Sequence, residues 1–438
     1  MNTVIQSRLA SRRNVLFGLL AAGVGIGATA CSRPSGTPGA TGGTPQGILK
    51  WATPAQAGPE TEAFRQVANL VKAAAPGLEV NLDAAYATNY YDTLVTRTVA
   101  GRGPDLMTCQ STMLPSLVNR GLLTPLADLP TNPEKSADGK YSKNTTAAMS
   151  FDGKQYLMPY DIGPCFLWYN KDLLASKGIA EPSPTKAMSH AEFLAIGDAL
   201  KDGGHTFLYS SAPAFDYITP WLWSAGGEFL SEDRKTWLLG TDASVAAMED
   251  FVALYRNGYA KPITDLTSTN AIGDFASGKI GFTPGGPWDS QYLRDQKLRF
   301  QWGFTPIPSG TGGSATWVAG SGMGVAAKSK NAAGGARALE ILSNLDAQKI
   351  LASSGRAYPA RSDAVQFYGG PDTLPKNVAA IETIIADPTT RPYLTTPAWQ
   401  QIQTVLARDL MTALLPGGDT AKQIKIVQPQ CQQLLAKS

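Results

Sequence analysis

The chain has very little histidine, with only His190 and His205 among its 438 residues. Neither stands at metal-ligand spacing from another histidine or from a cysteine, and no G-x-S-x-G or G-x-x-x-x-G-K-[ST] motif occurs. Gly322, Gly324 and Ala327 superficially fit a dinucleotide-binding fingerprint, but they fall within an expected strand and do not follow one. The sequence therefore predicts no metal site, no cofactor and no enzyme of these motif classes.

Charged residues are also scarce, at 17% of the chain. Arg8, Arg12 and Arg13 account for the whole formal net charge of +3, which leaves 35 basic and 35 acidic residues in the rest of the chain. No block of basic residues is present, so the sequence lacks the electrostatic footprint of a nucleic-acid-binding protein. We expect no nucleic-acid partner.

Residues 1–31 have the pattern of a targeting segment. The apolar run from Val15 to about Ala30 is too short and too rich in glycine for a membrane-spanning helix. Arg12-Arg13 resembles a twin-arginine export signal, although paired arginines also occur in ordinary secretory leaders. Ala28-Thr29-Ala30-Cys31 resembles a bacterial lipobox, in which Cys31 would be lipidated, although that pattern prefers leucine at position 28. Simple cleavage after Ala30 is the alternative.

An exported chain would carry a low-complexity segment after Cys31 and three further cysteines. Residues 32–47 carry one charge and no large apolar side chain, so we expect a flexible tether with a reach of roughly 20 Å. If Cys31 is lipidated, Cys109, Cys165 and Cys431 leave at least one thiol unpaired within the chain. A disulfide between Cys109 and Cys165 and buried free thiols are both open at this point.

The stretch from Phe151 to Leu174 organises the rest of the sequence. Asp152-Gly153 suits a tight hairpin turn, because both residues tolerate positive φ angles. Pro159 cannot donate to a sheet ladder, so one strand is expected to end there and another to begin near Cys165. Two strands separated by a proline and glycine break indicate a chain that leaves one sheet and enters another.

Several short sequence motifs in the chain resemble those of one known family. Phe151–Lys154, Pro159-Tyr160 and Tyr169–Leu173 stand in the order found in the carbohydrate-binding extracellular solute-binding proteins of ABC importers, which include maltose-binding protein. Further phrases of the same family occur at Gly103–Leu106, Gly121–Leu126, Phe275–Lys279, Trp302–Ile307 and Pro359–Arg361. The resemblance runs from about Ile48 to Arg361.

The expected fold class is α/β, with a two-lobed periplasmic-binding-protein-like fold. The β-α-β-α rhythm from Ile48 to Arg120 predicts parallel strands covered by helices, and the resemblance implies two such lobes with mainly parallel sheets. Crossovers are expected near Tyr160, Phe304 and Pro359. They divide the chain into lobe 1, residues 48–160 and 304–358, and lobe 2, residues 161–303 and 359–438.

A sugar presents an apolar C–H face and a rim of hydroxyl groups, so its site needs aromatic platforms beside polar side chains. The resemblance assigns sugar stacking to Trp288, which follows Gly285-Gly286-Pro287, with a core tryptophan as the alternative. The other candidate ligand-binding residues are Gln110, Asp161, Tyr217, Trp317 and Arg361, for each of which a structural role is the alternative.

The resemblance implies a binding protein that delivers a sugar or oligosaccharide to ABC permease subunits, and that is exported and held at the membrane by lipidated Cys31. The first alternative is the same fold binding a polyamine, a glycerol phosphodiester or another non-sugar solute. A secreted glycosidase would need a carboxylate pair across the cleft, and no such pair stands out. The identity, linkage and length of the sugar stay open, as does the permease.

Overall fold

The computed structural model describes residues 45–54, 58–84, 89–201, 206–211, 214–264, 266, 270–369 and 378–438. These residues belong to one compact unit, which spans residues 43–438. Cys31, the Arg12-Arg13 pair and nearly all of the expected tether lie outside the described residues. Within the described part, no helix is long and apolar enough to cross a membrane.

The first sheet has five strands in the order β2-β1-β3-β13-β6. They are β1 (Gly47–Ala52), β2 (Leu78–Asp83), β3 (Leu106–Gln110), β6 (Met158–Pro159) and β13 (Ser321–Val325). Alternate residues of β3 face opposite sides of this sheet, as the two-residue period of a strand requires. Leu106 packs in one apolar cluster and Met107 in another, so both faces of the sheet are covered.

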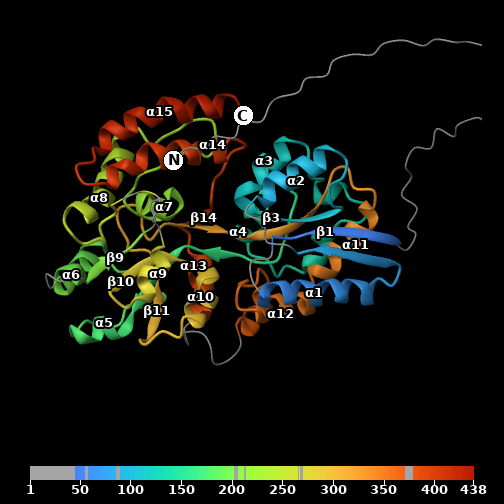
Figure 1. Cartoon of the computed structure of the whole chain (residues 1–438), viewed down its shortest axis with the longest axis horizontal. Coiled ribbons are helices and arrows are strands. Elements are labelled where there is room, and N and C mark those ends of the chain that lie inside the picture. Colours follow the sequence, from blue (N-terminus) through green and yellow to red (C-terminus); the bar gives the residue numbers. More distant parts are fainter. Residues whose placement is uncertain are drawn as a thin grey trace, which may run out of the picture. The chain divides into compact units, whose positions relative to one another are not determined.

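Helices cover the two faces of the first sheet (Figure 1). One face is covered by α1 (Gly58–Ala74), α11 (Ala332–Leu342) and α12 (Leu345–Ser353), and the other by α2 (Tyr90–Val99) and α3 (Leu114–Asn119). The helix α1 packs one apolar stripe against the sheet, because Phe64, Val67, Ala68 and Val71 are all buried.

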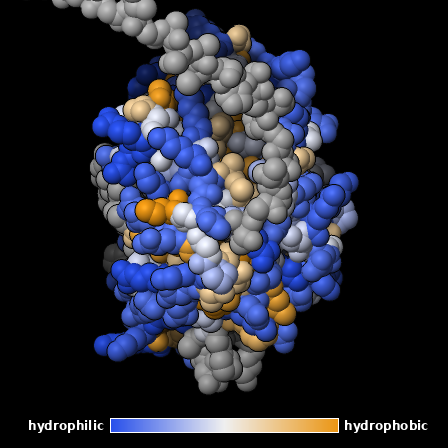
Figure 2. All heavy atoms as spheres, turned by 90° about the vertical axis from the view of Figure 1, so that its right-hand side faces the viewer, coloured by the Kyte–Doolittle hydropathy of each residue, from blue (hydrophilic) through white to orange (hydrophobic). Residues whose placement is uncertain are grey.

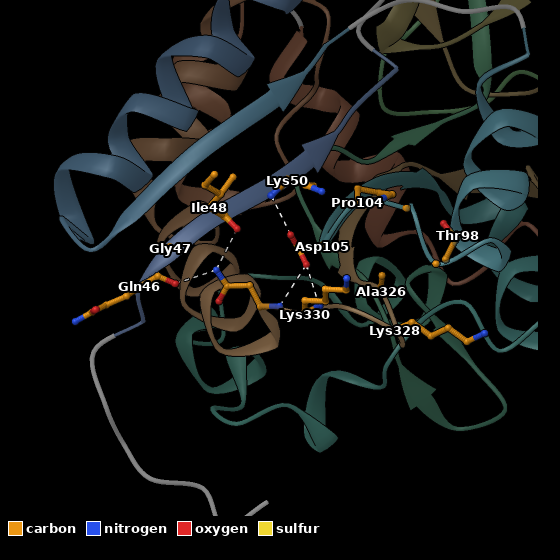
Figure 3. Close-up of a pocket in the computed structure, with 13 residues that line it drawn as sticks. Gln46, Gly47, Ile48, Lys50, Thr98, Pro104, Asp105, Ala326, Lys328 and Lys330 are labelled. Carbon is orange, nitrogen blue, oxygen red and sulfur yellow. Dashed lines mark hydrogen bonds between the residues drawn. The ribbon is translucent and has the colours of Figure 1, made fainter. Parts of the chain in front are cut away.

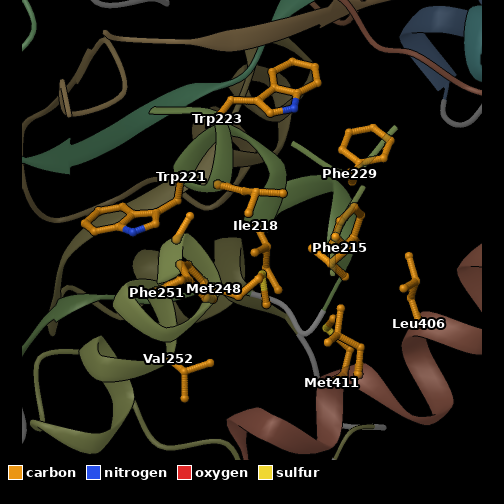
Figure 4. Close-up of a cluster of buried hydrophobic side chains, with 14 of the residues drawn as sticks. Phe215, Ile218, Trp221, Trp223, Phe229, Met248, Phe251, Val252, Leu406 and Met411 are labelled. Carbon is orange, nitrogen blue, oxygen red and sulfur yellow. The ribbon is translucent and has the colours of Figure 1, made fainter. Parts of the chain in front are cut away.

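The second sheet has four strands in the order β11-β8-β10-β9. They are β8 (Phe166–Asn170), β9 (Phe207–Tyr209), β10 (Ile280–Gly285) and β11 (Trp302–Thr305). The surrounding helices are α5 (Lys171–Ser176), α6 (His190–Leu200), α7 (Phe215–Ser224), α8 (Asp242–Arg256), α9 (Ala271–Ala276), α10 (Ser290–Asp295), α14 (Trp399–Arg408) and α15 (Thr420–Ala436). Figure 4 shows part of one core of these helices, in which aromatic residues of α7 face Met248 and Phe251 of α8 and Leu406 of α14. The C-terminal helices α14 and α15 therefore pack on the same core as α7 and α8.

A third sheet, β14-β12-β7, lies where the chain passes between the two larger ones. It contains β7 (Gly163–Pro164), β12 (Thr316–Ala319) and β14 (Thr390–Pro392). Two of the expected crossovers lie beside this sheet, because β6 ends at Pro159 in the first sheet and Pro359 forms a bridge with Asp161. Shorter elements are α4 (Lys143–Ala148), α13 (Ile381–Ala386) and the antiparallel pair β4 (Ser150–Phe151) and β5 (Lys154–Gln155). That pair confirms the Asp152-Gly153 turn, in which both residues have positive φ.

The structure corrects the expected crossover at Phe304. Phe304 pairs with Trp168 inside the second sheet, so β11 is a regular member of that sheet. The chain crosses later, between Ala319, which pairs with Gly163, and Ser321, which pairs with Gln110. The physical reason is burial: Phe304 packs against Phe166 and Trp168 in an apolar core that the hinge does not provide.

Two further features concern strand direction and the cysteines. The predicted mainly parallel sheets each contain one reversed strand, because β13 runs antiparallel to β3 and β6, and β8 runs antiparallel to β10 and β11. Strands that return from the other lobe enter each sheet in the opposite sense. The possible disulfide is also absent from the described residues, in which Cys109, Cys165 and Cys431 are free and buried.

Candidate functional site

A cavity of about 270 Å³ opens at the crossovers. Its walls come from the end of β3, the start of β7, the first turn of α7, the segment after β10, the crossover after β12 and the segment after α12. The lining residues are Gln110, Thr112, Asp161, Ile162, Gly163, Asp216, Tyr217, Pro287, Trp288, Trp317, Ala319, Gly320, Ser321, Arg356 and Tyr358. Five of the six predicted ligand-binding residues are among them. Segments that are hundreds of residues apart are thus brought to one site.

Trp288 lies in the short 3-10 helix Pro287–Asp289 that follows β10. Its indole ring lies over the backbone of Gly286 and Gly163, where an added Cβ would collide with it or press on it. Gly286 and Gly163 thus make room for the tryptophan ring itself. The half-buried indole then forms part of the cavity wall.

Trp317 in β12 lies parallel to Trp288, with ring centroids 5.6 Å apart and planes inclined by 4°. Trp317 is only 6% exposed, and its Nε1 donates to the backbone carbonyl of Asp216 over 2.8 Å. Tyr393 packs against its ring, with a centroid separation of 5.4 Å. Trp317 is therefore fixed from behind, and Trp288 is the more accessible of the two rings.

Asp161 follows the first crossover and is held by the backbone N–H of Ser321, which donates to its Oδ1. Burial raises the pKa of Asp161 to about 7, although that hydrogen bond and the charge of Arg356 act in the opposite direction. Gly320 allows this contact, because a Cβ there would collide with the Asp161 carbonyl. The protein groups around Asp161 thus offset only part of the cost of burying its negative charge.

Gln110 and Tyr217 lie on different walls of the cavity. Gln110 ends β3, where its exposed side chain borders the cavity and its N–H donates to the Tyr91 hydroxyl over 2.8 Å. Tyr217 is half-buried in the first turn of α7. Both side chains end in groups that can exchange hydrogen bonds with hydroxyls.

Asp216 also lines the cavity, but its carboxylate is already occupied. It accepts hydrogen bonds from the Tyr393 hydroxyl at 2.6 Å and from Nε2 of Gln403 at 3.0 and 3.1 Å. Burial raises its pKa, and the Tyr393 and Gln403 donors act in the opposite direction. Asp216 therefore braces the wall behind Trp317, and Asp161 is the carboxylate with capacity left for a ligand.

The structure does not bring Arg361 to the cavity. Arg361 is 4% exposed, and it donates to both carboxylate oxygens of Asp363, at 3.0 and 2.9 Å, and to the carbonyl of Ser343 at 3.0 Å. These bonds use up its guanidinium on the first lobe. Its expected contact with a ligand hydroxyl or carboxylate is thus replaced by a structural ion pair.

Sequence reasoning missed Arg356, which supplies the guanidinium of the cavity. Arg356 follows α12, and its Nη1 donates to the backbone carbonyl of Trp288 over 3.0 Å. It thereby joins the end of a first-lobe helix to the aromatic wall on the second lobe. The available signal was its position after Gly355 and just before the Pro359 crossover, which places a charge at the hinge.

The arrangement suits recognition of a neutral, hydroxyl-rich molecule. Flat aromatic surface from Trp288 and Tyr217 lies beside the carboxylate of Asp161, the amide of Gln110 and the guanidinium of Arg356. Such groups lose free energy when a buried ligand fails to pair them, which makes them discriminating. Among the described residues no group of three or more His, Cys, Asp or Glu side chains could hold a metal ion.

Comparison with known proteins agrees with this fold. Residues 57–349 match the family described as bacterial extracellular solute-binding protein. A binding protein of Brucella abortus is 23% identical over 382 residues, which cover 85% of this chain and 90% of that protein. The maltooligosaccharide ABC transporter solute-binding lipoprotein of Streptococcus pneumoniae is 25% identical over 313 residues, or 67% of this chain and 68% of that protein.

A solved structure extends the comparison. The ABC substrate-binding protein Lmo0181 of Listeria monocytogenes, in complex with cycloalternan, superimposes with a TM-score of 0.74 at 19% identity. The match covers 89% of this chain and 99% of that one. The two-lobed fold predicted from the sequence is thus confirmed, and the family match covers well over half of the chain. The chain belongs to the bacterial extracellular solute-binding proteins, a family of binding proteins.

Proposed function

We propose that this protein is the substrate-binding component of an ABC importer and captures a sugar or oligosaccharide in the cavity at the crossovers. The main support is that the accessible Trp288 ring lines the same cavity as Asp161 and Arg356. The ring offers an apolar plane to the C–H face of a sugar, and the charged groups are placed to pair its hydroxyls. The sugars in the names of the pneumococcal relative and the Listeria complex support the same ligand class.

Binding is proposed to be reversible and to involve closure of the two lobes. Arg356 and Gln110 belong to the first lobe, whereas Trp288 and Tyr217 belong to the second, so a ligand that touches all four favours the closed arrangement. The lobe boundaries predicted from the sequence are retained in this proposal, with the second crossing moved to Ala319–Ser321.

We also propose that Cys31 carries a lipid anchor and that the closed form delivers its ligand to permease subunits at the membrane. The support is the lipobox-like Ala28–Cys31 sequence followed by the tether of residues 32–47, together with a relative that is named a lipoprotein. The twin-arginine-like pair favours export of the folded chain. This would place the protein outside the cytoplasm, on the outer side of the membrane.

A titration of the lipid-free chain with monosaccharides, linear and cyclic oligosaccharides, polyamines and glycerol phosphodiesters tests the proposal. Tryptophan fluorescence reports directly on the site, because Trp288 and Trp317 line it. At ligand concentrations of 100 times Kd the free energy of unfolding is expected to rise by about 2.7 kcal/mol. If a polyamine or a glycerol phosphodiester stabilises the fold and no sugar does, the ligand is that solute and not a sugar. Release of sugar from a chromogenic glycoside would instead identify a glycosidase.

A further inference from the structure

A group of exposed side chains lies at the start of β1, where the described part of the chain begins. Ile48, Lys50, Lys328 and Lys330 line a second cavity, of about 370 Å³ (Figure 3). Arg102 lines an adjoining cavity together with Lys50 and Gly103, and the exposed Val99 directly follows Thr98, which lines the second cavity. We call Ile48, Lys50, Val99, Arg102, Lys328 and Lys330 the junction patch.

The basic side chains of the junction patch are not used within the fold. All four are exposed, and no ion pair of the described residues involves Lys50, Arg102, Lys328 or Lys330. Elsewhere in the described chain, exposed arginines such as Arg65 and Arg97 do pair with carboxylates. The junction patch therefore presents cationic groups that remain available to an external anion.

Three acidic residues lie close to these cations. Asp105 is nearly buried, and its carboxylate accepts bonds from the backbone N–H of Lys50 at 3.0 Å, the Ser329 hydroxyl at 2.7 Å and the backbone N–H of Lys330 at 3.1 Å (Figure 3). Its role is to hold β1 to the segment before α11. Glu79 is exposed on β2 beside Ile48, and Asp83 lines an adjoining cavity with Lys50 and Arg102, where it pairs with Arg97. Five cations against these three carboxylates leave the surface net positive.

Apolar groups are mixed with these charges. Ile48 is 54% exposed and Val99 is 61% exposed, and only Ile426 joins them among the exposed large hydrophobic residues of the described chain. The start of β1, at the right of Figure 1, faces the viewer in Figure 2, where isolated hydrophobic atoms stand among largely hydrophilic ones. Unpaired cations around protruding aliphatic side chains are typical of a surface that contacts lipid headgroups.

The position of the junction patch agrees with such a contact. The expected tether, residues 32–47, joins the body at Gly47, next to Ile48. β3 begins at Leu106, directly after Asp105 in the second cavity, and ends at Gln110 in the ligand cavity. At about 3.3 Å per residue the two cavities are separated by roughly 15 Å along this strand. A membrane in contact with the junction patch would thus not cover the ligand cavity.

We propose that the junction patch docks the protein onto an anionic lipid surface. This rests on the lipid-anchor part of the proposed function, because a tether from Cys31 with a reach of roughly 20 Å would keep the patch beside the membrane. The anionic headgroups attract Lys50, Lys328 and Lys330, whose flexible stems let the ammonium groups reach phosphate. Ile48 and Val99 then enter the headgroup region. The anchored protein is held in a fixed orientation with its ligand cavity accessible.

The test uses a chain that begins at Ser32, so that no lipid is attached and failure of the anchor cannot affect the result. Residues 43–438 form the compact unit that contains every described core residue, so this chain keeps the whole folded body. Flotation with vesicles containing about 30% phosphatidylglycerol is compared with flotation on pure phosphatidylcholine vesicles. We expect binding to the anionic vesicles only, lowered at least about tenfold in Lys50→Gln/Lys328→Gln/Lys330→Gln.

Two matched variants complete the design. Lys422→Gln/Lys425→Gln/Lys437→Gln removes the same charge from exposed lysines of the C-terminal region and is expected to bind like the parent chain. Lys50→Arg/Lys328→Arg/Lys330→Arg keeps the charge and is expected to retain binding. The proposal is overturned by equal flotation on both vesicle types, by no flotation, or by equal losses in the two glutamine variants. Sugar affinity, measured in parallel, reports separately on the proposed function.

Discussion

The indole planes of Trp288 and Trp317 are parallel to within 4°, and their centroids are 5.6 Å apart. The two rings differ in how firmly they are held. Trp317 is buried and hydrogen-bonded to the Asp216 carbonyl, whereas Trp288 is half-buried and its ring rests on glycine backbone. This difference predicts that substitution at the two positions will separate binding from stability.

Trp288→Ala is expected to weaken sugar binding by at least tenfold, or about 1.4 kcal/mol, because the ligand loses its aromatic platform. Its melting temperature should change little, since a half-exposed ring contributes less to the core than a buried one. Trp168→Ala is the control, because Trp168 is fully buried in β8, and about 3–5 kcal/mol of stability should be lost there. Calorimetric titration and thermal unfolding measure both. Unchanged affinity together with a large fall in melting temperature would show that Trp288 is a core residue and not a ligand platform.

The two arginines near the third crossover should respond in opposite ways. Arg356→Gln is expected to weaken ligand binding, because it removes the guanidinium from the cavity and its bond to the Trp288 carbonyl. Arg361→Gln should leave affinity within about twofold and lower the free energy of unfolding by about 1–3 kcal/mol, because it leaves Asp363 and the Ser343 carbonyl without donors. Binding and unfolding measurements on both variants decide the assignment. A loss of affinity in Arg361→Gln alone would reverse it.

This pair of arginines shows where sequence reasoning reached its limit. Proline and glycine breaks act locally on the backbone, so the order of motifs could predict where the chain changes sheets near Tyr160 and Pro359. Five of the six predicted ligand-binding residues line one cavity, and their role in binding stays a prediction. Which arginine turns inward depends on the position of Asp363, two residues after Arg361, and of the Trp288 carbonyl, far away in sequence. Asp363 is close to Arg361 in sequence, but the Trp288 carbonyl is far from Arg356, so no local pattern shows which arginine reaches the cavity.

The crossover assigned to Phe304 failed for a related reason. Trp302–Ile307 is apolar enough for either a hinge strand or a sheet strand, and only pairing with Phe166–Asn170 decides between them. The one reversed strand in each large sheet was missed similarly, because residue patterns report burial and not the direction of a neighbouring strand. The β-α-β-α rhythm, by contrast, follows from local patterns, and the strands β1, β2 and β3 that it predicts are parallel and lie between helices.

Cys31→Ala tests the anchor. Since the lipobox-like sequence places this thiol directly before the tether, the variant is expected to leave the membrane fraction and appear in the soluble exported fraction. Cys165→Ala is a matched control, because Cys165 is buried beside β8 and should not affect partitioning. Fractionation after salt washing is the measurement. Retention of Cys31→Ala with membranes after that wash would remove the anchor from the proposal.

Sugar affinity should depend on pH through Asp161, whose pKa is raised to about 7 by burial. The ionised carboxylate is the better acceptor for sugar hydroxyls, so affinity is expected to rise as pH increases from about 6 to 8. Stability should follow the opposite sign. Because the unfolded pKa is near 3.9, the group stabilises the fold most below that pH, and this contribution is lost as pH rises through about 7. Asp161→Asn should abolish both dependences, and an unchanged pH profile in that variant would exclude Asp161 as their source.

A contact between the lobes predicts how closure is stabilised. Arg234 lies on the second lobe, 3.6 Å from the Asp152 carboxylate, with its guanidinium carbon 4.9 Å from the centroid of the Phe151 ring on the first lobe. Its backbone has a φ of 60°, which is unfavourable for a residue other than glycine, so the contact offsets a local cost. Each of the two interactions is worth about 0.5–1 kcal/mol at an exposed site.

Arg234→Ala should therefore open the ligand-free protein and raise the Kd for sugar by about three- to tenfold, since ligand binding and lobe contact favour the same closed form. Lys235→Ala is the neighbouring control, because Lys235 is exposed and no ion pair of the described residues involves it. Solution scattering gives the radius of gyration with and without ligand, and calorimetry gives the Kd. The parent chain should contract on saturation, and Arg234→Ala should start from a larger radius and contract further. Identical radii and affinities in the two variants would show that this contact does not stabilise closure.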